Sequence, residues 1–260
     1  EEDKISKEEY ENLTNEEKNR LSESPVKLFL RSVPRIFIYP ARGKVLLATM
    51  GASVMFYIFR VAMYAAPFYG FFAMIFGFCY IVACIVKIIE TAVTQEREDL
   101  FDWPSFTEMV DWFGKAFLFL VGWLICHGTA IVIFINLIRY EEIRFFVVAL
   151  SVGLFVVGIF VYPMYILSMS LVGGAASLNI INIVKAINAT FVSYALTFVI
   201  LIFTQILSGL IRLIPILGIP FFGSILKWFI FVYFLLVNMR LLGIFYKTHR
   251  LKLRWFGENE

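Results

Sequence analysis

Residues 68–86 read FYGFFAMIFGFCYIVACIV and contain no charged side chain. An α-helix needs about 20 apolar residues to cross a bilayer, because the hydrocarbon core is about 30 Å thick and a helix rises about 1.5 Å per residue. Five other windows are similarly apolar, and they are Lys44–Tyr64, Lys115–Ile138, Phe145–Met169, Phe191–Ile211 and Ile219–Met239. The sequence therefore predicts an all-α, polytopic transmembrane helical bundle of about six spans.

The composition of the whole chain also indicates a lipid environment. Hydrophobic residues make up 60% of the 260 residues, aromatic residues 18% and charged residues 17%, and the mean hydropathy is +0.82. A soluble domain of this length cannot bury so large an apolar share. Cys79, Cys84 and Cys126 lie in apolar runs without the paired spacing of a zinc site, so we interpret them as small hydrophobic residues.

The sequence lacks the common catalytic signatures. It has no GxxxxGKS/T phosphate-binding loop, no HExxH metal motif, no GxSxG nucleophile elbow and no GxGxxG fingerprint. We therefore predict that the protein is not an enzyme and that it uses no cofactor, no metal and no nucleic acid.

The distribution of cations predicts the orientation in the membrane. By the positive-inside rule, the connections that are richer in Lys and Arg face the cytoplasm. The cations of these connections and of the terminal segments are Arg31, Arg35, Arg42, Lys44, Lys87, Arg97, Lys115, Lys185, Arg240, Lys247, Arg250, Lys252 and Arg254. The opposite side holds Arg139, Arg144 and Arg212, with Glu141 and Glu142 beside them. Both termini are therefore predicted to be cytoplasmic.

The chain divides into three predicted parts. Residues 1–24 are acidic and contain two S/T-x-x-E capping boxes, which predict short cytoplasmic helices. Residues 25–43 alternate cations with apolar residues, which predicts a basic amphipathic segment in the headgroup layer. Pro34 and Pro40 are expected to break its helix. Residues 44–256 then form the six-span domain.

An acidic stretch, DLFDWPSFTEMVDWFGKAF at residues 99–117, leads into the third span. It predicts an amphipathic helix that starts at Pro104 and Ser105, with its two tryptophans at headgroup depth. We predict that this stretch docks on the basic terminal segments, and the docking residues are Asp99, Asp102, Trp103, Glu108, Asp111, Trp112, Arg31, Arg35 and Arg254. Acid–base chemistry by its carboxylates is an alternative, although acids near a helix N-terminus are also favoured by the helix dipole.

A second interfacial helix is predicted between the fourth and fifth spans. Asn179, Asn182, Lys185 and Asn188 recur at steps of three among isoleucine and valine residues. This spacing is typical of an amphipathic helix. The alternative is a re-entrant element that lines a transport path.

Four polar residues are predicted at membrane depth, and they form the candidate intramembrane site: His127, Gln205, Arg60 and Lys227. His127 either relays protons or binds a ligand, or else forms an interhelical hydrogen bond with Gln205 or Asn136. Arg60 and Lys227 are expected toward the outer leaflet, where they reach lipid phosphates or pair with Glu141 and Glu142. If they face inward instead, they would line an anion or lipid-headgroup pocket.

Five stretches, taken in order, resemble an uncharacterised family of bacterial six-span inner-membrane proteins. They are YPARGK, DWPSFTEMVDWFGKAFLFL, YPMYILSMSLVGGAASLNIINIVKAI, IRLIPILGIPFFG and MRLLGIFYKTHRLKLRWF. The resemblance covers Val26–Phe256. It implies six spans and a bacterial inner-membrane location, and it supplies no catalytic residues.

The function predicted from these observations is structural. Charged and polar residues concentrate on the predicted cytoplasmic side. The spans lack the clustered buried charge of a coupled transporter. We predict a non-catalytic subunit or scaffold of a larger membrane assembly, which contacts membrane lipids and binds protein partners at its cytoplasmic face. The alternative is a transporter or lipid-handling protein with a polar cavity near the bilayer midplane.

Overall fold

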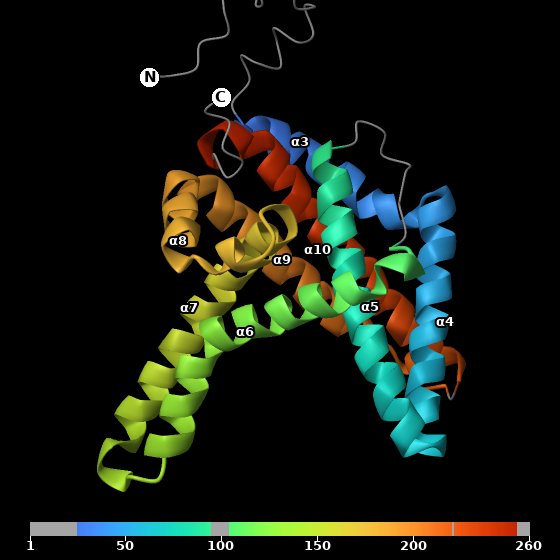
Figure 1. The fold of residues 1–260 in the computed structure, drawn as a ribbon, viewed down its shortest axis with the longest axis horizontal. Helices are drawn as coiled ribbons and strands as arrows, with labels where there is room; N and C mark the ends of the chain where they lie inside the picture. Colours follow the sequence, from blue (N-terminus) through green and yellow to red (C-terminus); the bar gives the residue numbers. More distant parts are fainter. Residues whose placement is uncertain (1–24, 95–103, 220, 254–260) are drawn as a thin grey trace, which may run out of the picture.

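The computed structural model describes residues 25–94, 104–219 and 221–253, and all regular elements within these ranges are helices (Figure 1). The α-helices are α3 (Pro25–Ile38), α4 (Gly43–Ala65), α5 (Pro67–Thr94), α6 (Met109–Leu137), α7 (Arg144–Leu171), α8 (Ile180–Ala189), α9 (Phe191–Ile211) and α10 (Phe222–Leu253). The short 3-10 helices are η1 (Tyr39–Ala41), η2 (Phe106–Glu108), η3 (Glu141–Ile143), η4 (Ala175–Leu178) and η5 (Pro215–Gly218). The predicted all-α fold is confirmed.

Six of these helices are long and apolar enough to cross a membrane, namely α4, α5, α6, α7, α9 and α10. The count agrees with the prediction. Two of them extend well beyond the predicted windows, since α5 continues past Val86 to Thr94 and α10 continues past Met239 to Leu253. Charged residues end an apolar window without ending a helix, because Lys, Arg and Glu are good helix formers.

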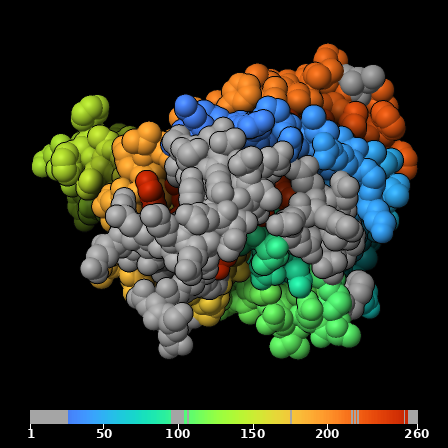
Figure 2. All heavy atoms as spheres, turned by 90° about the horizontal axis from the view of Figure 1, so that it is seen from above, coloured from blue at the N-terminus to red at the C-terminus, as the bar shows by residue number. Residues whose placement is uncertain are grey.

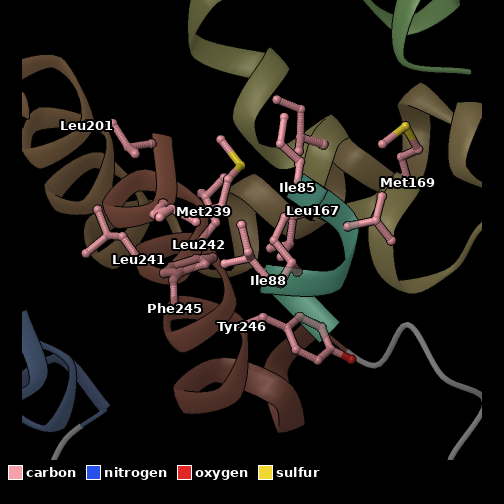
Figure 3. Close-up of a cluster of buried hydrophobic side chains, with 14 of the residues drawn as sticks. Ile85, Ile88, Leu167, Met169, Leu201, Met239, Leu241, Leu242, Phe245 and Tyr246 are labelled. Atoms are coloured by element: carbon pink, nitrogen blue, oxygen red, sulfur yellow. The ribbon is translucent and has the colours of Figure 1, made fainter. Parts of the chain in front are cut away.

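Helix α10 lies at the centre of the bundle. Its apolar window is 67% buried inside the protein, whereas those of α6 and α7 are each 17% buried. Leu241, Leu242 and Phe245 of α10 belong to one buried cluster with Ile88 of α5 and Leu167 of α7 (Figure 3). The last span therefore organises the core, and the other helices pack around it.

Helices α6 and α7 form a hairpin that projects from the bundle at the lower left of Figure 1. Apolar side chains are exposed on both of its helices, for example Leu124 and Ile135 on α6 and Val157 on α7. The two helices approach closely at Gly158, where an added Cβ would lie 2.3 Å from the carbonyl oxygen of Cys126. Most of the hairpin surface is thus available to lipid.

Helix α3 packs along α10 between Tyr233 and Phe245. Phe29 is fully buried, and its ring meets the Phe245 ring edge-on with 6.3 Å between centroids. At the other end of α3, the hydroxyl of Tyr233 donates a hydrogen bond to the carbonyl of Phe37. These two contacts make α3 antiparallel to α10. The apolar face of the amphipathic pattern is therefore covered largely by another helix.

Pro34 and Pro40 of the basic segment behave differently. The predicted break at Pro34 is wrong, because α3 continues through this residue. Pro34 is exposed, and at that position the helix loses one backbone hydrogen bond without losing its packing on α10. The prediction for Pro40 is confirmed, because α3 ends at Ile38 and Pro40 lies in η1.

The helix predicted between the fourth and fifth spans is present as α8. Gly173 and Gly174 have positive φ angles of 69° and 54°. Glycine adopts such angles readily because it has no Cβ, and the two residues turn the chain as it leaves α7. The Asn179 side chain caps α8 by accepting hydrogen bonds from two backbone N–H groups of the first turn. Lys185 and the neighbouring asparagines are exposed.

Both chain ends of the described bundle lie on one side. Helix α3, the last turns of α10 and helix α8 gather at the top of Figure 1, which we call the α3 end. The opposite end carries η3 and the elbow at Ala66 between α4 and α5, and we call it the hairpin end. Seen from the α3 end, α3 (blue) and the start of α6 (green) lie on opposite sides of the molecule (Figure 2).

Candidate functional site

His127 is buried within the α6–α7 hairpin. Its Nδ1 atom lies 3.2 Å from the carbonyl oxygen of Trp123 on the same helix. The imidazole stacks on the Trp123 ring at 5.4 Å and meets the rings of Phe155 and Tyr162 of α7 at 4.9 and 5.7 Å. His127 therefore fills an aromatic pocket that joins the two helices of the hairpin.

The structure does not bring His127 to either of the hydrogen-bond partners expected for it. The Asn136 amide donates instead to the carbonyl of Val132, one turn back on its own helix. Gln205 lies on α9 with its side chain exposed. An aromatic environment replaces the expected interhelical amide contact.

The two intramembrane cations lie elsewhere, on α4 and α10. Arg60 is exposed and Lys227 is half-buried. Their helices pack against each other, since the rings of Phe56 and Trp228 lie 5.3 Å apart. The four residues of the candidate intramembrane site thus separate into a buried histidine, an exposed glutamine and a pair of cations on neighbouring helices.

A buried polar contact that the sequence analysis missed joins α9 to α10. The hydroxyl oxygen of Thr204 lies 2.5 Å from the Asn238 side-chain oxygen on α10 and 2.7 Å from the Leu201 carbonyl oxygen on its own helix, so its single proton is shared between two acceptors, and both Thr204 and Asn238 are buried. Thr204 belongs to a row of buried hydroxyl residues that begins at the N-cap of α9 and continues along this helix, formed by Thr190, Ser193, Thr197, Thr204 and Ser208. These positions are separated by three, four, seven and four residues, and this spacing indicates one helix face.

A second buried polar contact lies at the junction between α3 and α4. The guanidinium carbon of Arg240 stands 4.8 Å from the ring centroid of Tyr39, and both residues are buried. Burial raises the pKa of the Tyr39 phenol above its ordinary value, although the positive charge of Arg240 acts in the opposite direction. The phenol therefore stays protonated at neutral pH, and the ring stabilises the cation.

Those predicted docking residues that the structure describes are not gathered on one surface. Trp112 is 1% exposed and packs against the rings of Phe76 and Tyr80 of α5 at 5.8 and 5.1 Å. Its indole is thus a core element and is withdrawn from any external contact. The tryptophan signature is equally typical of headgroup depth and of helix packing, so the sequence could not separate the two.

The charged docking residues lie on two separate helices. Arg31 and Arg35 are exposed on α3, and Glu108 and Asp111 are exposed at the start of α6 on the opposite side of the α3 end (Figure 2). Asp111 pairs with Lys115 on its own helix at 3.4 Å. The remaining predicted docking residues, Asp99, Asp102, Trp103 and Arg254, lie outside the described residues.

Neither of two well-formed cavities in the described part of the protein is lined by a residue of the candidate intramembrane site. One of about 30 Å³ lies between α4, α5 and α10, with Thr49, Tyr80 and Cys84 among its otherwise apolar lining. The other is a groove of about 240 Å³ between α6 and α7, lined by apolar residues and Ser151.

The fold defines an integral membrane protein with six membrane-spanning helices that contact lipid. Comparison with protein-family models, with curated proteins and with solved structures finds no match to this chain.

Proposed function

We propose that the protein is a non-catalytic membrane subunit or scaffold that binds protein partners at its α3 end. The observation that carries this proposal is the separation of the polar residues at membrane depth. His127 is enclosed by aromatic rings, Gln205 is exposed on α9, and Arg60 and Lys227 lie on α4 and α10. A transport path would need such groups to line one cavity, so their separation favours a structural role.

The α3 end supplies exposed charge of both signs on ordered helices. Arg31 and Arg35 lie one turn apart on α3, and the packing of Phe29 on α10 fixes the position of this helix. Glu108 and Asp111 add exposed negative charge at the start of α6, which lies across the molecule from α3 when it is viewed from the α3 end (Figure 2). A partner with complementary charges would be oriented by these side chains, because charge complementarity sets register and association rate.

We further propose that the protein belongs to the resembling family of bacterial inner-membrane proteins, with its α3 end in the cytoplasm. The described cations support this orientation, because Lys185, Lys247 and Lys252 lie at the α3 end together with the cations of α3. The positive-inside rule assigns such an end to the cytoplasm.

Photo-crosslinking in native membranes tests the proposed scaffold role. A photo-reactive amino acid is placed at Arg31 in one variant and, as a matched control at the hairpin end, at Glu142 in another. We expect a discrete protein adduct from position 31 only, and we expect its yield to fall several-fold when Arg35→Glu is added.

Two results would contradict the proposal. One is labelling of lipid alone from position 31. The other is movement of a solute or lipid by the purified protein in liposomes, with loss of that movement in His127→Leu or Gln205→Leu. The second result would establish the transport alternative.

A further inference from the structure

Three cations surround the turn between α9 and α10, and residues 212–227 contain no carboxylate. Arg212 directly follows α9, Lys227 lies in the second turn of α10, and Arg60 lies on the neighbouring α4. We propose that these three side chains bind one phosphate group of an anionic phospholipid. This binding site is separate from the proposed scaffold role and does not depend on a protein partner.

The position of Phe231 brings two of the cations together. The guanidinium carbon of Arg212 lies 5.7 Å from the centroid of the Phe231 ring. Lys227 is four residues before Phe231 on α10, and residues four apart lie next to each other on one face of a helix. Arg212 and Lys227 therefore flank the same ring.

Arg60 reaches the same region from α4. It lies one turn beyond Phe56, whose ring is 5.3 Å from that of Trp228. The Trp228 ring is in turn 5.8 Å from that of Phe231. Phe56, Trp228 and Phe231 thus form a continuous row of rings across the α4–α10 contact. Arg60 lies one turn from the α4 end of this row, and Arg212 stands over its last ring.

The turn itself is placed beside α4 by a further ring contact. The Phe221 ring, just before α10, meets the Tyr57 ring of α4 at 5.3 Å. Tyr57 lies three residues before Arg60. The connection between α9 and α10 therefore lies against the stretch of α4 that carries Arg60.

The three cations have no acidic partner among the described residues. Arg60 and Arg212 are exposed, and Lys227 is half-buried. Described carboxylates at the hairpin end belong to η3, at the tip of the α6–α7 hairpin and across the molecule from α4 (Figure 1). One of them, Glu141, already pairs with Arg144 at 3.3 Å.

The surroundings of the cations are apolar and face lipid. The exposed apolar residues of the turn are Leu213, Ile214, Ile219, Phe221 and Phe222. Cations next to hydrocarbon are costly unless an anion neutralises them. The ligand must therefore bring negative charge into a lipid-facing position.

A lipid phosphate meets both requirements. Arg60 lies five residues from the end of α4 at Ala65, which is about 7 Å along the helix, so its long side chain can extend to the headgroup layer. Arginine presents a planar fork of N–H donors that matches phosphate oxygens, and lysine adds a point charge. The acyl chains of the same lipid would cover the exposed apolar residues of the turn.

The test measures lipid binding to the full chain in mild detergent by native mass spectrometry, with phosphatidylglycerol as the probe and phosphatidylcholine as the zwitterionic comparison. We expect phosphatidylglycerol to bind preferentially. We also expect Arg60→Gln, Arg212→Gln and Lys227→Gln each to weaken this binding about tenfold, because a hydrogen bond to a charged group is lost.

The matched control is Arg139→Gln combined with Arg144→Gln, which removes two exposed cations from the tip of the α6–α7 hairpin at the same end of the protein. We expect less than a twofold change in this control. Arg60→Lys keeps the charge but loses the fork of donors, so it should weaken binding less than Arg60→Gln does, and this order separates loss of the site from loss of the fold.

Three results would overturn the proposal. The first is equal binding of phosphatidylglycerol and phosphatidylcholine. The second is an equal loss of binding in the hairpin control and in the three site variants. The third is displacement of the lipid by excess inorganic phosphate, which would assign the cations to a soluble anion.

Discussion

Single glycines set how closely the spans approach one another. At Gly122 of α6, an added Cβ would lie 1.9 Å from the ring of Tyr165 on α7, and the Tyr165 hydroxyl donates a 2.6 Å hydrogen bond to the carbonyl of Leu118. Small residues allow such contacts in membranes, where helix association depends on packing and on interhelical hydrogen bonds.

Gly158→Ala should destabilise the hairpin. The new methyl group would lie 2.3 Å from the Cys126 carbonyl oxygen, so the two helices must separate at a cost of about 1–3 kcal/mol. The free energy of unfolding in detergent measures this cost. Gly153→Ala on the same helix is the control, because no atom lies within 4 Å of its added Cβ, and an equal loss there would refute the packing argument.

The Thr204–Asn238 hydrogen bond should stabilise the contact between α9 and α10. A double-mutant cycle with Thr204→Val and Asn238→Leu should give a coupling energy of about 0.6–2 kcal/mol in the free energy of unfolding. Thr197→Val is the control, since its hydroxyl donates to the Ser193 carbonyl of its own helix. A coupling of zero between Thr204 and Asn238 would be inconsistent with the structure.

Sequence alone identified four polar residues of the spans, but it identified neither their neighbours nor the Thr204–Asn238 pair. His127 was found because an ionisable residue stands out in an apolar run, and its aromatic neighbours Phe155 and Tyr162 lie on another helix. Thr204 and Asn238 are common residues whose pairing depends on the tertiary packing of two spans. Local patterns carry no information about which helix faces are joined.

At the scale of helices, amphipathic patterns predicted the elements but not what covers them. The pattern of α3 is equally compatible with a lipid surface and with a neighbouring helix, and the structure places α10 against it through Phe29. Trp112 was expected at headgroup depth for the same reason and is instead packed on α5. The sequence shows that an apolar helix face will be covered. The tertiary arrangement of the helices then decides whether lipid or another helix covers it.

Phe29→Ala should release α3 from α10. Phe29 is fully buried, and truncation of a buried phenylalanine costs about 3–5 kcal/mol. Hydrogen exchange of the α3 amides should therefore become faster by on the order of 100-fold. Leu30→Ala is the matched control, because Leu30 is 45% exposed. Unchanged exchange in Phe29→Ala would show that α3 is held by lipid and not by α10.

At the scale of the whole molecule, the six spans followed from hydrophobic length alone, because satisfying the backbone in lipid leaves helices or closed barrels as the available forms. The arrangement of the spans relative to one another could not be predicted from hydrophobic length. The central position of α10 and the projecting α6–α7 hairpin arise from side-chain packing between distant segments. The hairpin combines long apolar helices with little internal burial, which leaves its surface to lipid.

The most direct test of the account is the sidedness of the chain in membrane vesicles. Single cysteines at Arg31, Lys252 and Glu142 are labelled with a membrane-impermeant maleimide, and the unsubstituted protein, with its three native cysteines in the spans, serves as the blank. The account predicts that positions 31 and 252 react from the same side and position 142 from the other. Labelling of positions 31 and 252 from opposite sides would contradict the six crossings, and with them the fold assigned to this protein.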